Sequence, residues 1–312
     1  MASTSLRVLR AGAALSQVLP PRINSAVVGT AAVAASRIPW GFGALSGLAQ
    51  RRESVARHVQ RIHSGRLDRR STRRLVDETF VSYARYWAES LRLPSLNPSQ
   101  IAEGITYRGF EHIEHAIQRG SGVILALPHL GGWEWAGADM ARRGFEISVV
   151  VERLADPEVF EWFAGFREEL GMHVIPTGAD AASRCSSALA DNQVLCLLCD
   201  RVVGGSAAVE VDFFGERTGL PAGPAMLGIR SGAPILPVAV YFCTTEGSHL
   251  ADILPPVVVA TEGRLRERVE STTQVLATDL EYLIRRAPSQ WHMLQPNWPS
   301  DPGWRSDGAA PG

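Results

Sequence analysis

Short apolar runs alternate with longer stretches of helical periodicity from about residue 122 onward. The apolar runs have the length and the aliphatic content of strands. They cover residues 122–127, 147–151, 173–176, 193–198, 207–213, 234–242 and 250–259. The helix-like stretches cover residues 133–143, 157–170, 179–190, 221–231 and 264–286. Because continuous apolar strands separated by helices are buried on both faces, the pattern predicts an α/β body whose sheet is covered by helices on both sides.

The first third of the chain has a purely helical pattern. Residues 47–63 and 68–92 predict two helices, and the second keeps apolar or aromatic side chains at i, i+3, i+4 spacing until Pro94 follows it. A further short helix is expected at residues 110–119. The predicted organisation is a basic helical N-terminal region that is a candidate membrane-docking element, an α/β body and a loose C-terminal tail. Their bounds are residues 1–93, 94–298 and 299–312.

The balanced total charge hides an asymmetry along the chain. All 31 basic residues are Arg, against 32 acidic residues, and the formal net charge is −1. Residues 1–92 carry a net charge of +10 and the remaining residues −11. The absence of Lys excludes a lysine Schiff base or a P-loop lysine, and the balanced total argues against a nucleic-acid partner. The basic N-terminal region indicates an anionic partner instead.

Two uncharged runs near the N-terminus are too short to cross a membrane. Residues 23–36 and 38–50 contain 14 and 13 residues, and Arg37 separates them, whereas a spanning helix needs about 20 apolar residues. We predict a helix that lies on an anionic membrane surface. A signal peptide and an ordinary amphipathic helix packed on the body remain open as alternatives.

The four cysteines do not indicate a metal site or an oxidising compartment. Cys196 and Cys199 have CxxC spacing, but they lie in a strand-like run with no second pair downstream. In a strand the two side chains point to opposite faces, whereas structural zinc sites and redox pairs need them on one turn. We therefore expect buried thiols and no metal, and we place the body in the cytoplasm.

The segment LALPHLGGWEW carries the sharpest local chemistry. His129 follows the end of an apolar strand, where open α/β sheets form their sites. Gly131 and Gly132 allow a tight turn that returns Glu134 towards the imidazole. A carboxylate on one ring nitrogen leaves the other free to accept a proton. Because no Ser, Thr or Cys stands in this segment, the activated hydroxyl is expected to belong to a substrate. A capping His beside a surface Glu is the alternative interpretation.

The pattern His129-x4-Glu134 resembles the H-x4-D/E motif of the glycerolipid and lysophospholipid acyltransferase superfamily. Further blocks follow in a matching order, namely ERLADP from Glu152 with Arg167 on the next helix, LLCDR ending at Arg201, FFGERTGLPAGP from Phe213 and GAPILPV from Gly232. Together they resemble the lipid A acyltransferase branch, and most closely the phosphatidylinositol mannoside acyltransferases of actinobacteria, over residues 75–295. The Glu-Gly-Thr-Arg block of the glycerol-3-phosphate branch is absent, which favours a glycolipid acceptor.

The resemblance implies both a fold and a reaction. The fold is a mixed, mostly parallel sheet wrapped by helices, with an acyl groove. The reaction is O-acyl transfer from acyl-CoA to a sugar hydroxyl of a phosphatidylinositol mannoside, with no acyl-enzyme. His129 is the implied general base and Glu134 its orienting carboxylate. The implied enzyme is peripheral on the cytoplasmic face of the cell membrane and needs no cofactor besides its co-substrate.

Other functions stay open at this point. The same motifs suit a lipid A-type acyltransferase or an enzyme acting on another glycolipid or a lysophospholipid. A different class is an acyl-CoA thioesterase that directs His129 and Glu134 at a water molecule. A non-catalytic lipid-binding scaffold is a third alternative.

Two pairs of residues in the matching blocks are candidates for binding substrate, and Arg167 among them lies on a predicted helix. Arg153 and Arg167 are able to bind phosphate, because a guanidinium forms bidentate hydrogen bonds to phosphoryl oxygens. Internal salt bridges are the alternative for both. Asp200 and Arg201 are placed to bind the acceptor or to order the site, and Asp200 is equally a candidate partner of Arg167.

Two further candidates lie in the FFGERTGLPAGP block. Phe213 is expected to line an acyl groove or to stack on a sugar, with a plain core position as the alternative. Thr218 precedes the predicted helix at residues 221–231, whose N-terminus favours an anion. A simple helix cap explains Thr218 equally well.

Overall fold

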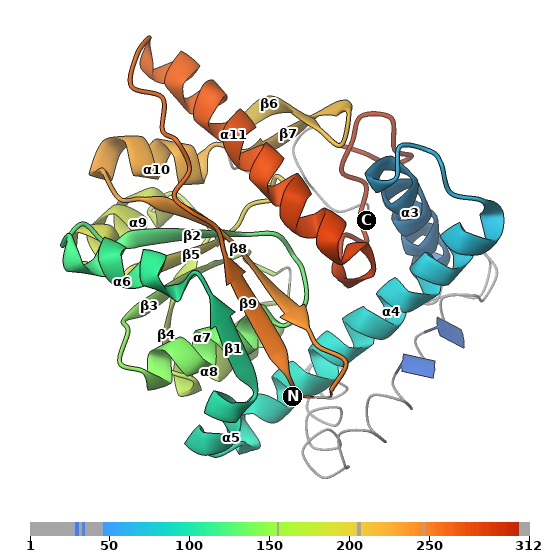
Figure 1. Ribbon diagram of the computed structural model, residues 1–312, viewed down its shortest axis with the longest axis horizontal. Coiled ribbons are helices and arrows are strands. Elements are labelled where there is room, and N and C mark those ends of the chain that lie inside the picture. The colour runs from blue at the N-terminus through green and yellow to red at the C-terminus, as the bar shows by residue number, and fades with distance from the viewer. Residues whose placement is uncertain are drawn as a thin grey trace.

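A seven-stranded sheet forms the centre of the protein (Figure 1). The computed structural model describes residues 29–30, 33–34, 46–154, 156–204, 207–245 and 247–305. In spatial order the strands are β1 (Ile105–Arg108), β9 (His249–Ile253), β8 (Ile235–Phe242), β2 (Val123–Leu127), β5 (Val194–Leu198), β3 (Ile147–Val151) and β4 (Met172–Pro176). All neighbouring strands are parallel except β8 and β9. The predicted mixed, mostly parallel sheet is therefore confirmed.

Helices cover both faces of this sheet, because its central strands are apolar on both sides. They are α5 (Pro98–Glu103), α6 (Phe110–Gln118), α7 (Trp133–Arg142), α8 (Pro157–Glu169), α9 (Ala181–Ala190), α10 (Gly223–Ser231) and α11 (Leu265–Arg286). Ile124 and Ala126 of β2 pack into the cluster formed with α9, α10 and α11. Val123 and Leu125 pack into the opposite cluster, formed with α5, α6 and α7. Figure 1 shows α10 and α11 above the sheet and α7 and α8 below it.

A separate antiparallel hairpin consists of β6 (Ala208–Phe213) and β7 (Glu216–Pro221). Its two connecting residues, Phe214 and Gly215, both have positive φ, at 52° and 79°. Such a two-residue turn matches the twist of the flanking strands, and Gly adopts it without the Cβ penalty. The hairpin packs on α11, where the Gln274 side chain bonds both the N–H and the carbonyl of Asp212.

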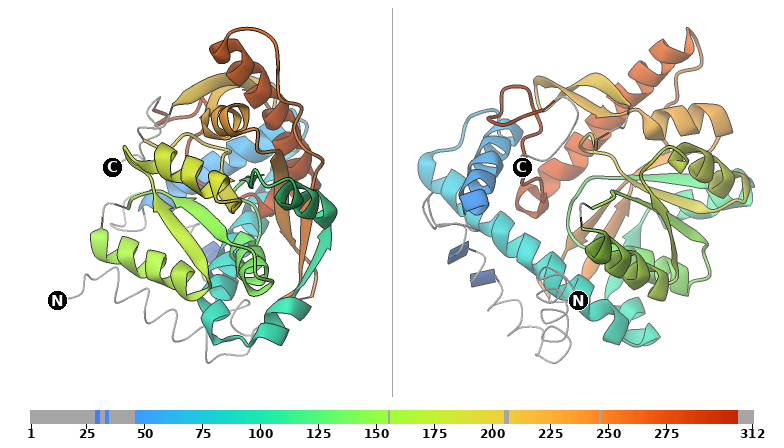
Figure 2. Two further views of the ribbon diagram at one scale, coloured as in Figure 1. Left: turned by 90° about the vertical axis from the view of Figure 1, so that its left-hand side faces the viewer. Right: turned by 180° about the vertical axis from the view of Figure 1, so that it is seen from behind.

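The two N-terminal helices of the continuous part of the structure lie beside the body. They are α3 (Ser46–Ile62) and the long α4 (Arg69–Arg92), which begins at the N-cap Asp68. Val55 and Val59 of α3 pack against Phe80 of α4, and Leu294 from the C-terminal segment completes this cluster. Figures 1 and 2 show α4 extending along the body as far as α5. The two predicted helices are confirmed, and the division near residue 93 stays a prediction.

The strand expected at residues 250–259 ends early, at Ile253. Pro255 and Pro256 follow it, and proline has no N–H with which to continue a ladder. Strand β7 was not expected, since its charged and glycine residues conceal an alternating pattern in which Thr218 and Leu220 are buried. Strand β1 and helix α5 were also missed, because each is short.

The predicted C-terminal tail is described only in part, and most of the predicted membrane helix lies outside the described residues. Asp301 is buried, so the part of the 299–312 segment that the structure describes is not loose around this residue. Residues 306–312 lie outside the described residues. So do residues 1–28, 31–32 and 35–45, on which the surface helix and the signal peptide were predicted. Among the helices described, none has both the length and the apolar character that crossing a membrane requires.

Candidate active site

The edge of the sheet brings together two residues that are far apart in the chain. Strand β2 ends at Leu127 and its parallel neighbour β5 at Leu198, and these two residues are directly paired. His129 and Asp200 each follow by two residues. Both therefore stand at the carboxyl end of the sheet, the position where open α/β folds form their sites.

The imidazole of His129 is held by the carboxylate of Asp200. Nδ1 of His129 lies 2.6 Å from Oδ1 of Asp200, and the backbone N–H of His129 donates to Oδ2 at 2.8 Å. Trp291 Nε1 donates to the same Oδ2 at 2.7 Å. The Asp200 side chain is fully buried, whereas 21% of the His129 side chain is exposed. This arrangement places the proton on Nδ1 and leaves Nε2 as the basic nitrogen.

Hydrogen bonding keeps Asp200 ionised despite its burial. Burial by itself raises the pKa of a carboxyl group. The charge of a protonated His129 and the donors on the Asp200 carboxylate act in the opposite direction, and the pKa of Asp200 lies below its usual value. Within the described part of the chain, no group hydrogen-bonds Nε2 of His129. The pair therefore has the form of a general base with its orienting acid.

The predicted contact between Glu134 and the imidazole is not formed. Glu134 lies in the first turn of α7 and is buried. Its Oε1 accepts hydrogen bonds from Arg167 at 2.5 Å and from the Tyr86 hydroxyl at 3.2 Å. The turn at Gly131 and Gly132 thus directs Glu134 towards α8 and α4. Asp200 takes Nδ1 because the two strand ends are adjacent, which corrects the orienting role predicted for Glu134.

The Glu134–Arg167 pair is itself an unusual buried feature. Burial lowers the pKa of Arg167, but the charges and hydrogen bonds of Glu134 and Tyr86 together more than compensate, and the net change is upward. Burial raises the pKa of the Tyr86 hydroxyl, and the same carboxylate raises it further. Arg167 therefore stays charged and the Tyr86 hydroxyl stays protonated at neutral pH. The structure brings Arg167 to Glu134, whereas Asp200 was the partner expected as an alternative.

An apolar cavity of about 70 Å³ lies between the sheet and α7. Aliphatic side chains of β2, β3, β5 and β8 line one wall, and Met140 of α7 and Met172 of β4 line the other parts. Glu134 and Arg167 also line this cavity, so the charged pair forms part of its otherwise apolar wall. Cys196 lines it too, and burial raises the pKa of this thiol to about 12. The CxxC cysteines are therefore unreactive thiols, as expected.

Four predicted site residues lie outside this constellation. Arg201 forms a salt bridge with Glu152 at 2.5 Å. Arg153 is exposed, and its Nε donates to the Thr177 carbonyl at 3.1 Å. Their binding roles stay predictions.

Phe213 and Thr218 are corrected to core positions. Phe213 is fully buried and stacks on Trp298, with ring centroids 5.7 Å apart. Thr218 is buried inside β7 and donates to the Asn297 carbonyl. It is not the cap of α10, which begins at Gly223 after the N-cap Ala222. Both side chains are therefore part of the packed interior, as in the alternative interpretation of Phe213.

The C-terminal segment supplies site residues that the sequence motifs did not indicate. Trp291 bonds Asp200, and the backbone N–H of His292 donates to the His129 carbonyl at 2.7 Å. Asn297 Nδ2 donates to the Asp200 carbonyl at 2.9 Å. The one available signal was the density of Trp, His and Asn in WHMLQPNW, between a helix and a proline-rich stretch.

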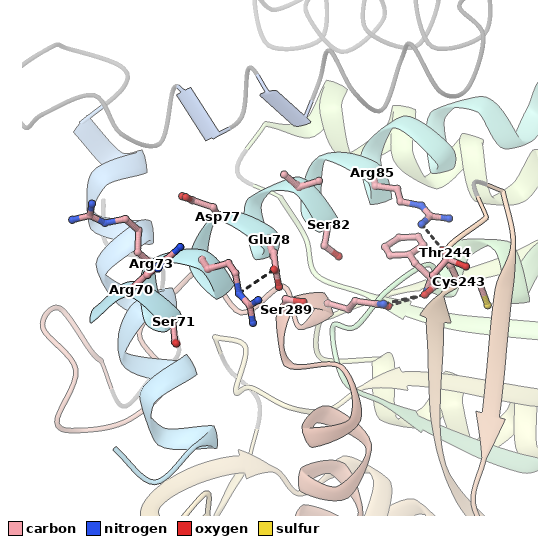
Figure 3. Close-up of a pocket in the computed structure, with 14 residues that line it drawn as sticks. Arg70, Ser71, Arg73, Asp77, Glu78, Ser82, Arg85, Cys243, Thr244 and Ser289 are labelled. Atoms are coloured by element: carbon pink, nitrogen blue, oxygen red, sulfur yellow. Dashed lines mark hydrogen bonds and ion pairs between the residues drawn. The ribbon is translucent and has the colours of Figure 1, made fainter. Parts of the chain in front are cut away.

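A larger cavity of about 900 Å³ lies along α4 (Figure 3). Its residues come from α4, the end of β8 and the turn before Trp291, and they include Arg70, Arg73, Arg74, Arg85, Ser82, Phe242 and Gln290. Ser82 also bonds Nε2 of His292 at 2.9 Å. The cavity is thus separated from the His129 backbone by one side chain. Among the described residues, no group of His, Cys, Asp or Glu is arranged to hold a metal ion.

Comparison with known proteins identifies the family of the chain. Residues 26–300 match the family described as bacterial lipid A biosynthesis acyltransferase. Because the match covers most of the chain, the protein belongs to this family of acyltransferases.

Individual members of known function class are also similar to the chain. The chain is 36% identical over 230 residues to the phosphatidylinositol mannoside acyltransferase of Mycolicibacterium smegmatis, and the matched region covers 73% of each chain. It is 37% identical over 232 residues to the protein of that name from Mycobacterium tuberculosis, which covers 73% of this chain and 71% of the relative. A lipid A biosynthesis acyltransferase of Haemophilus influenzae is 22% identical over 221 residues, 70% of this chain and 66% of the relative. The resemblance inferred from the motifs is confirmed.

Proposed function

We propose that the protein transfers a long-chain acyl group from acyl-CoA to a sugar hydroxyl of a phosphatidylinositol mannoside. One observation carries the proposal, namely an oriented His129–Asp200 pair beside an apolar cavity whose wall includes Glu134 and Arg167. The pair supplies a base and the cavity a place for an alkyl chain. The names of the mycobacterial relatives support the choice of acceptor.

The chemistry follows from the orientation of the imidazole. Nε2 of His129 accepts the proton of the sugar hydroxyl as its oxygen attacks the thioester carbonyl. Asp200 stabilises the imidazolium that forms, and it need not take the proton. The tetrahedral intermediate then expels the CoA thiolate, which receives the proton from His129. A base placed in this way contributes about 10²–10⁴-fold to the rate.

No acyl-enzyme is part of this proposal. The thiols closest to the pair in the chain are Cys196 and Cys199, and burial raises the pKa of both. A thiol that stays protonated is a poor nucleophile. The Ser82 hydroxyl bonds His292 rather than His129. The attacking oxygen therefore comes from the acceptor.

Glu134 acts in this proposal through Arg167. Its carboxylate holds the guanidinium in the wall of the apolar cavity, and we place the thioester of a bound acyl chain beside it. Arg167 then stabilises the oxyanion of the tetrahedral intermediate. One such donor is worth about 10²–10³-fold in kcat. Arg153 and Arg201 are proposed to bind phosphates of the substrates.

A long acyl chain requires the cavity to widen. Its volume of about 70 Å³ is roughly that of two water molecules in the liquid. Met140 and Met172 have flexible side chains that are able to make room. A Cβ added to Gly137 of α7 would lie 2.6 Å from Sδ of Met172.

Gly137→Ala therefore tests this cavity as the acyl site. We expect the variant to prefer a shorter donor, lowering the ratio of palmitoyl to decanoyl transfer about tenfold, since each buried CH₂ contributes about 0.8 kcal/mol. Gly165→Ala in α8 is the matched control, because a Cβ there meets nothing within 4 Å. An unchanged chain-length preference in Gly137→Ala would remove the cavity from the proposal.

The proposed location is the cytoplasmic face of the membrane, reached through the basic N-terminal region. Arg70 and Arg73 are exposed near the start of α4 and line the larger cavity. No acidic residue occupies the first turn of this helix, where the helix dipole favours one. Such a concentration of Arg suits anionic lipid head groups.

Vesicle sedimentation tests this docking. The double variant Arg70→Gln/Arg73→Gln is expected to bind phosphatidylinositol-containing vesicles about thirtyfold more weakly, since each of the two basic residues contributes about 1 kcal/mol. Arg119→Gln/Arg230→Gln removes the same charge from exposed positions on α6's end and α10. Equal binding by both double variants would contradict docking through α4.

The central experiment incubates the purified protein with palmitoyl-CoA and one acceptor at a time. The acceptors are a phosphatidylinositol mannoside, a lipid A precursor and a lysophospholipid, and palmitoyl acyl carrier protein replaces the CoA donor in a parallel series. Mass spectrometry of the lipids and release of free thiol are measured together. We expect a palmitoylated mannoside and thiol release that depends on it. Thiol release without any acceptor would instead show a thioesterase.

A further inference from the structure

The segment after α11 crosses the edge of the sheet on which the catalytic pair lies. We call residues 291–301 the C-terminal strap. Trp291 pairs with Leu130 through an isolated antiparallel bridge, and the N–H of His292 donates to the His129 carbonyl at 2.7 Å. Just before the strap, the Gln290 carbonyl accepts the Gly131 N–H at 3.0 Å. The strap and Gln290 thus hold the backbone of the loop from His129 to Gly131.

The strap also holds Asp200 at two places. Trp291 Nε1 donates to the carboxylate at 2.7 Å, and Asn297 Nδ2 donates to the backbone carbonyl at 2.9 Å. The other donors to this carboxylate are the ring and the backbone N–H of His129. Among the described residues, Trp291 is therefore the one donor that ties the carboxylate to something other than His129. Without it, the imidazole and the carboxylate are free to shift together.

The far end of the strap is fixed to α3 by buried charges. Asp301 accepts hydrogen bonds from the backbone N–H groups of Asn297 and Trp298, at 2.9 and 3.1 Å. Arg61 of α3 lies 2.6 Å from the same carboxylate, and its guanidinium stacks on the Trp298 ring at 4.4 Å. The Asp301 side chain is completely buried. Because both ends of the strap are fixed, its side chains are able to hold Asp200 in one position.

We propose that Trp291 and Asn297 are positioning residues that aim the Asp200 carboxylate, and through it the His129 imidazole, at the substrate. This inference deepens the proposed function and rests on it. Neither residue touches a reacting atom. Their effect is to keep Nε2 in the direction of the acceptor hydroxyl, and a loss of aim of about 1 Å is enough to slow an oriented reaction by about 10²-fold.

Trp291→Phe is the direct test, because it keeps an aromatic ring and removes the N–H donor. The matched control is Trp298→Phe, which makes the same change in a ring 6.2 Å away whose Nε1 donates to the Phe213 carbonyl. We expect kcat of Trp291→Phe to fall about 10–10²-fold with KM almost unchanged. Trp298→Phe should keep kcat within about twofold of the wild type. Equal kcat losses in the two variants would overturn the proposal.

Proton NMR of protein carrying ¹⁵N-labelled histidine gives a readout that does not need turnover. The Nδ1–H of His129, recognised by its absence in His129→Gln, is expected to shift and broaden in Trp291→Phe and to stay in place in Trp298→Phe. An unchanged resonance in Trp291→Phe would show that the N–H is irrelevant to the pair. This result is independent of which acceptor or donor the enzyme uses.

Asn297→Ala serves if Trp291→Phe does not fold. Its backbone contacts to Asp301 and Thr218 do not involve the side chain and are retained. We expect a kcat loss of about 3–10-fold with unchanged KM, and wild-type kcat would contradict the role of Asn297. Failure of the proposed function looks different, because the wild-type protein itself would then transfer no acyl group to the mannoside.

Discussion

The site contains two buried carboxylates whose surroundings differ in kind. Asp200 accepts hydrogen bonds from an imidazole, a backbone N–H and an indole, and within the described part of the chain its ion-pair partner is His129 alone. Glu134 is held by a guanidinium and a phenol, in a salt bridge that lines the apolar cavity. One carboxylate is arranged to respond to a proton arriving on its partner. The other is arranged to hold a fixed positive charge in place.

The difference shows why distance along the chain misleads. Glu134 is five residues from His129 but belongs to α7, whose start directs it away from the ring. Asp200 is 71 residues away but follows, by two residues, the end of the strand β5 that pairs with β2. In a parallel sheet, strand pairing brings together the residues that follow two adjacent strands. The turn into the next helix, in contrast, moves residues apart that are close in the sequence.

Removing the basic nitrogen of His129 is expected to cause the largest loss of transfer activity. His129→Gln keeps a side chain that is able to hydrogen-bond Asp200 but offers no basic nitrogen. We expect transfer to fall about 10³-fold or more, measured as palmitoyl transfer with the melting temperature as a control for folding. Wild-type-like turnover in this variant would remove both carboxylates from the reaction as proposed.

Asp200→Asn comes next, with an expected loss in kcat of about 10²–10³-fold. The amide is unable to stabilise an imidazolium, and it favours the wrong tautomer of the ring. The loss should disappear in the His129→Gln background, because residues that act as a unit are not additive. Equal losses in both backgrounds would separate Asp200 from the base.

Glu134→Gln is expected to cost about 10²-fold in kcat and also to lower stability. The change leaves the buried Arg167 without its counter-charge, and breaking such a pair costs about 3–5 kcal/mol. Differential scanning calorimetry should show a melting temperature several degrees lower. Adding Arg167→Met should recover stability but not activity, whereas recovery of activity would contradict the role given to the guanidinium.

The smallest expected effect is a pH dependence of stability. It comes from His292, which lies beside the His129–Asp200 pair. Burial, and secondarily the charge of His129, lower the pKa of the neighbouring His292 to about 3. Between about pH 6.5 and pH 3 the unfolded chain binds a proton at this residue that the folded chain does not. The free energy of unfolding must therefore fall as the pH decreases through this range, by a few kcal/mol at most.

Thermal melts at pH 7, 5.5 and 4.5 check this expectation. His292→Phe keeps the aromatic contacts with Tyr83 and Tyr86 and removes the titration. Its melting temperature should decrease less steeply towards acid than that of the wild type. Parallel curves for the two proteins would place the acid sensitivity elsewhere.

The sequence predicted the fold well because burial on both faces leaves a strong apolar signal. The runs at β2, β3 and β5 were placed within one residue. It also located His129, since a strand end beside a glycine turn is a local feature. It did not find Trp291, His292 or Asn297, whose contacts depend on a C-terminal segment crossing the sheet. Nor did it show that Phe213 and Thr218 are core residues, because that depends on the packing of the hairpin.

One measurement tests most directly the claim that Asp200, and not Glu134, orients the base. The imidazole N–H resonances of ¹⁵N-histidine-labelled protein are recorded for the wild type, Asp200→Asn and Glu134→Gln. The deshielded Nδ1–H of His129 should be lost or shifted strongly in Asp200→Asn and should persist in Glu134→Gln. Loss of this resonance in Glu134→Gln, with its retention in Asp200→Asn, would contradict the account.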